Sequence, residues 1–431
     1  LHGAPGAYRL TIAASSFAET VRTVTLMESD AEPLQIVLEV APLRTSVVVT
    51  EAPGYQTVAS SSATRTLTPL RDVPQSVTVV TQQLIQDQEM LSMADVVRYM
   101  PGVTAIQGEN NRDQLVIRGN STSADFFLNG VRDDVQYYRD LYNVDRVEAL
   151  KGPNAMAFGR GGGGGVINRV TKDAFFMPLR DFTIEGGSFN TKRVATDLNQ
   201  PFGGNIAGRL NAMYENSGTF RDFGHIERFG VNPTMTFTPA SHTRITVGYE
   251  HFSDHRGADR GITSYQGRPA DLPINTFYGD PDYSRVRALV DLESVTFEQE
   301  GDRWNLRNRS MFGEYDRGYQ NFVPGAANAD KTQVALTGYN NATKRLNFFN
   351  QTDLTYTARA FGFKHTLLGG LELGRQYTDN FRNTAFFNNT ATTINVPYSS
   401  PTVFLSVTFR QVATDADNHL NTGVAAAYVQ D

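Results

Sequence analysis

The stretch from residue 114 to residue 172 constrains the fold most, because it alternates short β-strand patterns with turns that the sequence itself imposes. The apolar residues 126–128 run into Asn129-Gly130, a dipeptide suited to a tight hairpin turn. Residues 144–150 alternate apolar and polar side chains, and Lys151-Gly152-Pro153 ends the pattern. The expected strands are residues 114–118, 126–128, 144–150 and 166–171.

A glycine-rich run at residues 159–165 invites comparison with a phosphate-binding loop. Gly159, Gly161 and Gly164 satisfy the spacing GxGxxG, but this motif binds phosphates only where it joins a strand to a helix. Here residues 166–170 favour a strand, and no Gly-Lys-Ser/Thr follows. The run instead predicts a turn in which backbone passes close to other backbone.

Composition excludes several classes of protein. The 431 residues contain no cysteine, which rules out a disulfide scaffold and a zinc–thiolate site. The formal net charge of −6, without a block of Lys or Arg residues, gives no sign of a basic surface that would bind nucleic acid. His251 and His255 fall at a strand end and loop, where their spacing does not suit a metal. No catalytic constellation occurs, so we expect neither an enzyme nor a resident metal or other cofactor.

After residue 172 the chain changes to segments of about ten alternating residues separated by turns. Within residues 243–251, Ile245, Val247 and Tyr249 share one face, and Arg244, Thr246 and Gly248 share the other. This period, at membrane-strand length, is typical of a transmembrane β-barrel with a wet interior. A soluble β-sandwich of many strands fits the same pattern. No run approaches the ~20 apolar residues that a membrane helix needs.

Six motifs occur in order over residues 69–173, and they are LRDVPQSVTVV, MADVVRYMPGV, RG, NGVRDD, RVEALKGPNAMAFG and GGVINRVTK. Together they resemble the plug domain of TonB-dependent outer-membrane receptors. This family usually has Asp-Gly where the chain has Asn129-Gly130, and Tyr-Gly where it has Phe158-Gly159. The resemblance implies a mainly β fold, with a small α+β plug at residues 69–175. The plug would lie inside an antiparallel transmembrane β-barrel, whose N-terminal part is residues 176–431.

Residues 1–50 contain strand patterns at residues 7–13, 20–26 and 34–40. They resemble part of the carboxypeptidase-regulatory-like β-sandwich modules that precede some of these receptors. Residues 46–52, SVVVTEA, have two readings, a last sandwich strand or the segment that pairs with a sheet edge of the energy-coupling protein. The coupling residues would be Val47, Val48, Val49, Thr50 and Glu51. Residues 51–68, rich in Ser, Thr and Ala, predict a mobile linker.

Within the plug, Thr81 and Ser92 are expected to cap helices at residues 82–90 and 93–100. Long loops are expected at residues 255–284 and 378–402. The resemblance implies that three plug loops and the first of these barrel loops meet the ligand. The matching residues are Asn110, Arg112, Gln136, Tyr137 and Tyr138 in the plug, and Arg256, Arg260, Tyr265 and Arg268 in the barrel loop.

Tyrosine rings would stack on an aromatic ligand there, and arginines would hold an anion. Alternatively, the plug loops are simply solvated, and the arginines pair with Asp254, Asp259 and Asp271 nearby.

HRGADRGITSYQGRP and KHTLLGGLELGRQ are similar to the catecholate-type ferric siderophore receptors of this family. The implied function is energy-coupled import of a ferric siderophore through the bacterial outer membrane, with lipid and a TonB-type inner-membrane complex as partners. The ligand itself would carry the iron. Two alternatives stay open: the same mechanism for a vitamin or an oligosaccharide, and a non-transporting adhesion or structural protein of the cell surface. We expect the chain to be a fragment that lacks a signal peptide and stops partway through the barrel.

Overall fold

The computed structural model describes residues 6–12, 20–26, 54–152, 158–159 and 162–431. They belong to two compact units, residues 1–53 and 54–431. In the first unit, β1 (Gly6–Ile12) pairs antiparallel with β2 (Thr20–Leu26), which matches two of the three strand patterns in the sequence. The third pattern and the coupling residues Val47, Val48, Val49, Thr50 and Glu51 lie outside the described residues.

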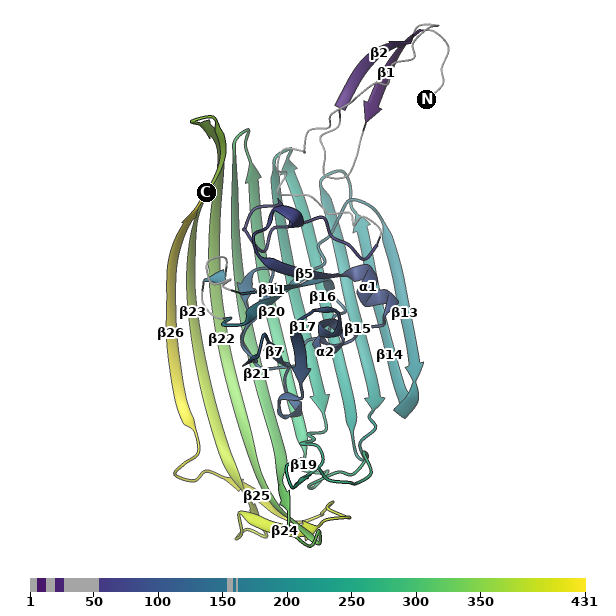
Figure 1. Cartoon of the computed structure of the whole chain (residues 1–431), viewed down its shortest axis with the longest axis vertical. Coiled ribbons are helices and arrows are strands. Elements are labelled where there is room, and N and C mark those ends of the chain that lie inside the picture. The colour runs from purple at the N-terminus through teal and green to yellow at the C-terminus, as the bar shows by residue number, and fades with distance from the viewer. Residues whose placement is uncertain (1–5, 13–19, 27–53, 153–157, 160–161) are drawn as a thin grey trace. The chain divides into compact units, whose positions relative to one another are not determined.

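The plug forms the first part of the second unit, and it lies across one face of a much longer sheet (Figure 1). Its main sheet has the order β10-β9-β12-β11-β5, in which β12 is parallel to β9 and antiparallel to β11. The strands are β5 (Ser76–Thr81), β9 (Phe126–Leu128), β10 (Val131–Arg132), β11 (Val144–Lys151) and β12 (Gly165–Thr171). Smaller sheets join β3 (Ala59–Ser60) to β4 (Thr68–Pro69), and β6 (Val103–Ile106) to β7 (Gln114–Ile117) and β8 (Asn120–Thr122).

Two short helices, α1 (Gln82–Asp87) and α2 (Met93–Val96), begin at the predicted caps. Thr81 Oγ1 accepts a hydrogen bond from the Leu84 backbone N–H at 3.3 Å, and Ser92 Oγ accepts one from Asp95 at 3.3 Å. Both helices are shorter than the sequence predicts. The first ends before Glu89, which adopts a φ of +48°, and the second passes into a 3-10 turn at Val97–Tyr99.

The helices pack on the plug sheets around one apolar core. Met93 and Val97 both face this core and are buried. Other members of the core are Val80, Ile85, Val96, Met100, Leu115, Ile117, Phe126, Val144, Val147 and Ile167.

Two turns confirm the local predictions made from glycine. Asn129 and Gly130 both have positive φ, +51° and +83°, as a tight hairpin between β9 and β10 requires. Gly164 passes so close to β7 that a Cβ atom on it would lie 2.0 Å from the Ile117 carbonyl oxygen. Backbone contact, not phosphate binding, therefore explains the end of the glycine run.

The rest of the chain forms one long antiparallel sheet with the order β13-β14-β15-β16-β17-β20-β21-β22-β23-β25, while β24 pairs with β22 and β26 pairs with β23. The strands are β13 (Leu179–Gly187), β14 (Thr191–Pro201), β15 (Ile206–Gly218), β16 (His225–Ala240), β17 (Thr243–Arg256), β20 (Arg285–Glu300), β21 (Trp304–Ala327), β22 (Gln333–Ala360), β23 (Phe363–Phe387), β24 (Thr393–Pro397), β25 (Val407–Arg410) and β26 (Asp417–Gln430). A separate hairpin joins β18 (Ser264–Tyr265) to β19 (Arg268–Pro269).

Most of these strands are longer than the segments of about ten residues that the sequence shows, although β13, β24 and β25 are shorter. The strand β22 alone has 28 residues. The prediction of a loop at residues 378–402 is wrong in its first part, because residues 378–387 continue β23 and pair with β22, β25 and β26.

The two faces of the long sheet have opposite chemistry. Along β15, the polar residues Arg209, Asn211 and Glu215 are buried on the side of the plug, while Leu210 and Tyr214 are exposed on the other side. A soluble sandwich would bury its apolar face against a second sheet, whereas a membrane barrel turns that face to lipid. The structure therefore favours the barrel over the sandwich. Among the described residues, no helix is long and apolar enough to cross a membrane.

The prediction of a mobile linker is wrong for residues 54–68. Ser60 is buried and donates a hydrogen bond to Glu148 Oε1 at 2.9 Å. Arg65 donates one to the Tyr428 hydroxyl at 2.8 Å, and its guanidinium lies 4.6 Å from the centre of the Tyr428 ring. The small polar side chains of this stretch satisfy buried polar groups of the plug and sheet, so they mark a packed segment.

We predict that Gly164→Ala destabilises the plug by about 1–3 kcal/mol, because the new methyl group would overlap the Ile117 carbonyl. Gly163→Ala is the matched control, since its nearest neighbour would be Asn120 Oδ1 at 3.8 Å. Denaturant unfolding of the plug in the purified full-length protein measures both. Equal effects of the two substitutions would contradict the close approach.

Candidate functional site

The long sheet has one end with long connections and one end with short turns. Short turns join β16 to β17, β20 to β21 and β22 to β23. At the opposite end, residues 257–284 connect β17 to β20 and residues 388–406 connect β23 to β25. In receptors with this architecture the longer loops are extracellular. The plug loops that meet these long connections therefore form the candidate ligand site.

Glu109 joins the plug to both the long loop and the sheet at this end. Its carboxylate lies 2.6 Å from Arg112 Nη1 and 2.9 Å from Arg260 Nη1. The Tyr339 hydroxyl of β22 donates a further hydrogen bond to Glu109 Oε1 at 3.1 Å. Burial alone would raise the pKa of Glu109, but hydrogen bonds from Arg260 and Arg112 outweigh it and lower the pKa to about 2. Glu109 is thus a charged anchor between three elements.

Tyr138 forms a second contact between plug and sheet. The Arg256 guanidinium lies 4.0 Å from the centre of the Tyr138 ring, and Arg256 Nε also donates to Asp254 Oδ1 at 3.1 Å. The Tyr138 hydroxyl donates to the Gln107 carbonyl at 3.1 Å and lies 3.3 Å from Asn110 Oδ1. Burial raises the pKa of Tyr138 to about 12, so the phenol stays neutral.

A group of aromatic and cationic side chains on β21, β22 and β23 lines the same region. The Tyr319 and Tyr339 rings lie 5.6 Å apart and nearly perpendicular. Arg382 covers Tyr339 at 3.9 Å, and Arg317 covers Tyr319 at 4.8 Å. Arg317 also donates to Asn111 Oδ1 of the plug at 3.1 Å. The sequence analysis missed these four residues and Glu109, because only the strand register brings them together.

One predicted ligand residue, Tyr137, is buried in this structure. Tyr137 is only 3% exposed, and its ring packs 6.2 Å from Phe252 and 6.3 Å from Tyr315. Its hydroxyl donates to Asp133 Oδ2 at 3.0 Å. Tyr137 therefore belongs to the apolar contact between plug and sheet and offers no ring to a ligand in this conformation.

Most of the other predicted ligand residues already form ion pairs or hydrogen bonds within the protein. Arg256 pairs with Asp254, as the alternative reading expects, whereas Arg260 pairs with Glu109 and not with Asp259. Gln136 donates to Ser123 Oγ at 2.8 Å, and Arg112 is tied to Glu109.

The hairpin of β18 and β19 presents the remaining two. The Tyr265 hydroxyl donates to the Ala329 carbonyl at 3.2 Å, and Lys331 lies 4.5 Å from the centre of its ring. Arg268 is exposed and forms no ion pair with any carboxylate that the structure describes.

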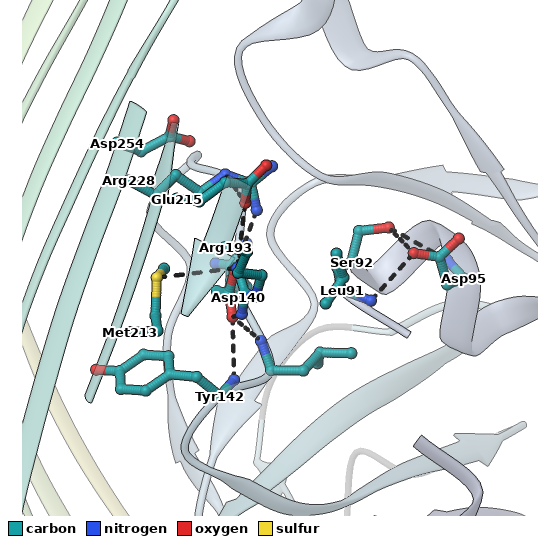
Figure 2. Close-up of polar contacts among 12 residues, drawn as sticks. Leu91, Ser92, Asp95, Asp140, Tyr142, Arg193, Met213, Glu215, Arg228 and Asp254 are labelled. Atoms are coloured by element: carbon teal, nitrogen blue, oxygen red, sulfur yellow. Dashed lines mark hydrogen bonds and ion pairs between the residues drawn. The ribbon is translucent and has the colours of Figure 1, made fainter. Parts of the chain in front are cut away.

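The contacts around Glu109, Tyr138, Tyr319 and Tyr339 are called the apex below. Farther along the wall from the apex, Asp140 holds the plug to β14 and β16. It lies 2.7 Å from Arg193 Nη2 and 3.1 Å from Arg228 Nη1, while Glu215 approaches Arg193 Nη1 at 3.1 Å (Figure 2). The Asp140 carboxylate also accepts the backbone N–H groups of Leu141 and Tyr142. Burial raises its pKa, but the arginines and these hydrogen bonds outweigh burial, so the pKa of Asp140 stays below its usual range.

Chemically, the apex combines guanidinium groups with tyrosine rings, which suits an anionic aromatic ligand. The residues that the structure describes contain no group of three or more His, Asp or Glu side chains arranged to hold a metal ion.

Comparison with known proteins agrees with this architecture. Residues 69–166 match the family model of the TonB-dependent receptor plug domain. The chain is 28% identical over 379 residues to the probable TonB-dependent siderophore receptor PiuA of Acinetobacter baumannii, covering 80% of this chain and 51% of that protein. It is 27% identical over 372 residues to the catecholate siderophore receptor Fiu of Escherichia coli, covering 78% of this chain and 48% of Fiu.

The crystal structure of PiuA from Acinetobacter baumannii superposes with a TM-score of 0.76 at 22% identity, covering 87% of this chain and 64% of that one. These likenesses confirm the plug and the barrel-type sheet. The relatives are receptors and not enzymes, and TonB-dependent receptors of this kind are outer-membrane β-barrel proteins. The chain spans about half the length of the curated relatives it matches.

We predict that Asp140→Asn lowers the free energy of unfolding of the plug by about 3–5 kcal/mol, because it leaves two buried arginines without their shared carboxylate. Asp316→Asn is the control, since its pair with Arg287 is half-exposed on the outer face and is worth about 0–1 kcal/mol. Protease protection of the plug in urea, in the full-length protein, measures both. Similar shifts for the two variants would argue against the buried contact.

We also predict a pH dependence at Glu109. A lowered pKa means that its contribution to stability is fully present above the ordinary value of 4.5 and is lost as the pH falls through about 2. In protein labelled with ¹³C at glutamate carboxyls, we expect the Glu109 resonance to titrate near 2 and to move toward 4.5 in Arg260→Gln. Arg268→Gln, in the same loop but unpaired, should leave it in place. A Glu109 pKa that is the same in Arg260→Gln as in the wild-type protein would contradict the proposed contact between Glu109 and Arg260.

Proposed function

We propose, from the premise that residues 69–166 are a TonB-dependent receptor plug domain, that the full-length protein imports ferric siderophores of the catecholate class through the bacterial outer membrane. A TonB-type inner-membrane complex would supply the energy. The observation that carries the proposal is the cationic and aromatic apex, built on a plug that fills the polar face of a barrel wall. The named ligands of the relatives Fiu and PiuA support the siderophore class.

The chemistry of the ligand suits the apex. A catecholate complex of Fe(III) is anionic and aromatic, so guanidinium groups attract it and tyrosine faces stack on it. Arg268 and Tyr265 on the exposed hairpin are well placed for first contact. Binding can signal across the plug only if the ligand prefers one plug conformation to another. Glu109 is suited to this role, because a competing anion for Arg260 or Arg112 would loosen its contacts.

The inner side of the plug offers a mechanical route for the coupling step. Tension applied to residues 47–51 would be transmitted to the packed segment that follows. In that segment Ser60 donates a hydrogen bond to Glu148 on β11. Glu148 is in turn bonded to Arg146 Nε at 3.0 Å and to Asn168 Nδ2 at 3.0 Å. Force would thereby reach β11 and β12, the central strands of the plug sheet. A non-transporting surface protein would have no use for such a connection.

The test is uptake of a radiolabelled ferric catecholate by iron-starved cells that express the full-length protein. We expect saturable uptake that stops when the proton-motive force is dissipated. Replacing residues 46–52 with a Gly/Ser segment of equal length should stop uptake and leave surface binding unchanged, since it removes only the strand that pairs with the coupling partner.

Uptake that continues without the proton-motive force would contradict the mechanism. Binding without any uptake would favour an adhesion protein. Uptake of a vitamin or an oligosaccharide in place of the catecholate would keep the mechanism and replace the ligand.

A further inference from the structure

The outer face of the long sheet has a hollow near the end with the long connections. The hollow has about 1060 Å³ of empty space and crosses β17, β20, β21, β22 and β23. Side chains alternate between the two faces of a strand, so the register shows which lining residues point outward. Outward-pointing members are His255, Arg285, Arg287, Gly318, Ala342 and Phe381. Neither Asp nor Glu occurs among the described residues that line the hollow.

Two small residues make the floor of the hollow. Gly318 on β21 lies directly opposite Ala342 on β22, between Arg287 on β20 and Phe381 on β23. The flanking side chains rise above this floor because a glycine and an alanine leave it almost bare. Beyond the floor, Gln320 Nε2 donates to the Tyr283 carbonyl of the long loop at 2.8 Å. The hollow is therefore covered toward the long loops and open at the side of the wall.

Arginine side chains supply the charge of the hollow. Arg285 is exposed and forms no ion pair with any carboxylate that the structure describes. Arg287 points the same way about 7 Å along the strand, and His255 lies opposite it on β17. Arg287 Nη2 donates to Asp316 Oδ1 at 2.7 Å, but a guanidinium has five N–H donors, so this contact leaves donors for a second anion. Arg285 and Arg287 are thus spaced to hold one phosphate between them.

The carboxylates of the outer face near the hollow already have partners of their own. These contacts are Asp316 with Arg287, Asp379 with His419, and Glu227 with the Tyr214 hydroxyl. Lys344 is exposed and lies in register between Asp316 and Asp379, and within the described part of the chain it forms no ion pair. The positive charge of Arg285 and Lys344 is therefore available to an anion from outside the chain.

The apolar band of the wall shows what surrounds the hollow. On β22 this band runs from Tyr356, which lies opposite Trp304 near the short turns, to Leu346. Its length agrees with the ~9–11 residues that a tilted strand needs to cross a bilayer. Ala342 lies beyond Leu346 on the side of the long connections, about 10 Å farther out on a tilted strand. The hollow therefore lies at the level of lipid headgroups in the outer leaflet.

The height of the hollow also favours a large headgroup. The headgroup layer of a phospholipid bilayer extends only about 5–8 Å beyond the hydrocarbon on each side. A glycolipid carries its phosphate on a sugar, which reaches farther from the acyl chains. The bare floor at Gly318 and Ala342 gives such a sugar room, and the Phe381 ring beside it, 39% exposed, offers an apolar face.

We propose that this hollow binds a phosphorylated glycolipid of the outer leaflet. Arg285 and Arg287 hold the phosphate, and the sugar lies over Gly318 and Ala342 against Phe381. The site concerns the outer wall, so it stands whether or not the protein imports a siderophore. Because Arg285 is the first residue of β20, directly after the long loop, a bound lipid would also hold the end of that loop.

The first test is native mass spectrometry of the purified full-length protein in detergent, titrated with diphosphorylated lipid A. We expect saturable binding that Arg285→Gln weakens about fivefold, while Arg285→Lys retains most of it. Arg303→Gln, which removes an exposed arginine at the short-turn end of the wall, is the matched control and should bind normally.

Three outcomes would overturn the proposal. The first is unchanged lipid A binding by Arg285→Gln, and the second is equal binding of dephosphorylated lipid A or of phosphatidylglycerol. The third is displacement of lipid A by an equal concentration of inorganic phosphate, which would show a site for the free ion.

The second test fills the hollow and keeps every charge. A Cβ atom on Gly318 would have the Asn341 carbonyl oxygen, 3.9 Å away, as its nearest neighbour, so Gly318→Ile fits the strand. We expect it to keep the melting temperature and to weaken lipid A binding at least as much as Arg285→Gln does. Ala212→Ile, on the same face of β15 but far from the hollow, should bind normally. Normal binding by Gly318→Ile would contradict the location of the site, and Arg285, exposed and unpaired, tests it independently of packing.

Discussion

Buried charge on the inner face of the long sheet is the constraint on which the rest of the structure depends. Arg193 and Arg228 point away from the apolar outer face, and both form ion pairs with Asp140 of the plug and with Glu215. Without the plug, these side chains would need water, and without the sheet, Asp140 would be a carboxylate with no cation. The plug has an apolar core of its own, but much of its contact with the wall is charged, so the plug and the wall complete each other. In the wall, the apolar residues that an ordinary soluble domain would bury lie instead on the outer face.

This polar interface also explains how a plug can be both well held and movable. Ion pairs and hydrogen bonds can be exchanged for contacts with water or ligand at a smaller net change than an apolar core of equal area. The contacts are unevenly distributed. They are close at β14 and β16, they converge on Glu109 at the apex, and they are sparse around two cavities lined in part by Arg309. The distribution leaves one flank of the plug held by several ion pairs and another flank held by fewer contacts.

Local sequence determined much of the fold. The Asn129-Gly130 hairpin, the Thr81 and Ser92 caps and the close approach at Gly164 each follow from a few neighbouring residues, and the alternation in β17 reveals which face is apolar. The site was less predictable. Tyr137 is buried by Phe252 and Tyr315, and Glu109 contacts Tyr339. These contacts join residues more than 100 positions apart in the chain, so they depend on the strand register. Residues 54–68 have the composition of a linker, and only their partners, such as Glu148, show that they are packed.

The most direct test of the two-faced wall is the accessibility of spin labels placed one at a time along β17 in the full-length protein in lipid bilayers. Labels at Ile245, Val247 and Tyr249 should collide readily with oxygen dissolved in the bilayer, and labels at Thr246, Gly248 and Glu250 should be shielded by the plug and inner wall. This alternation is the expected result for a wall between lipid and plug. Equal shielding of both sets, as in two sheets packed around a dry middle, would contradict it.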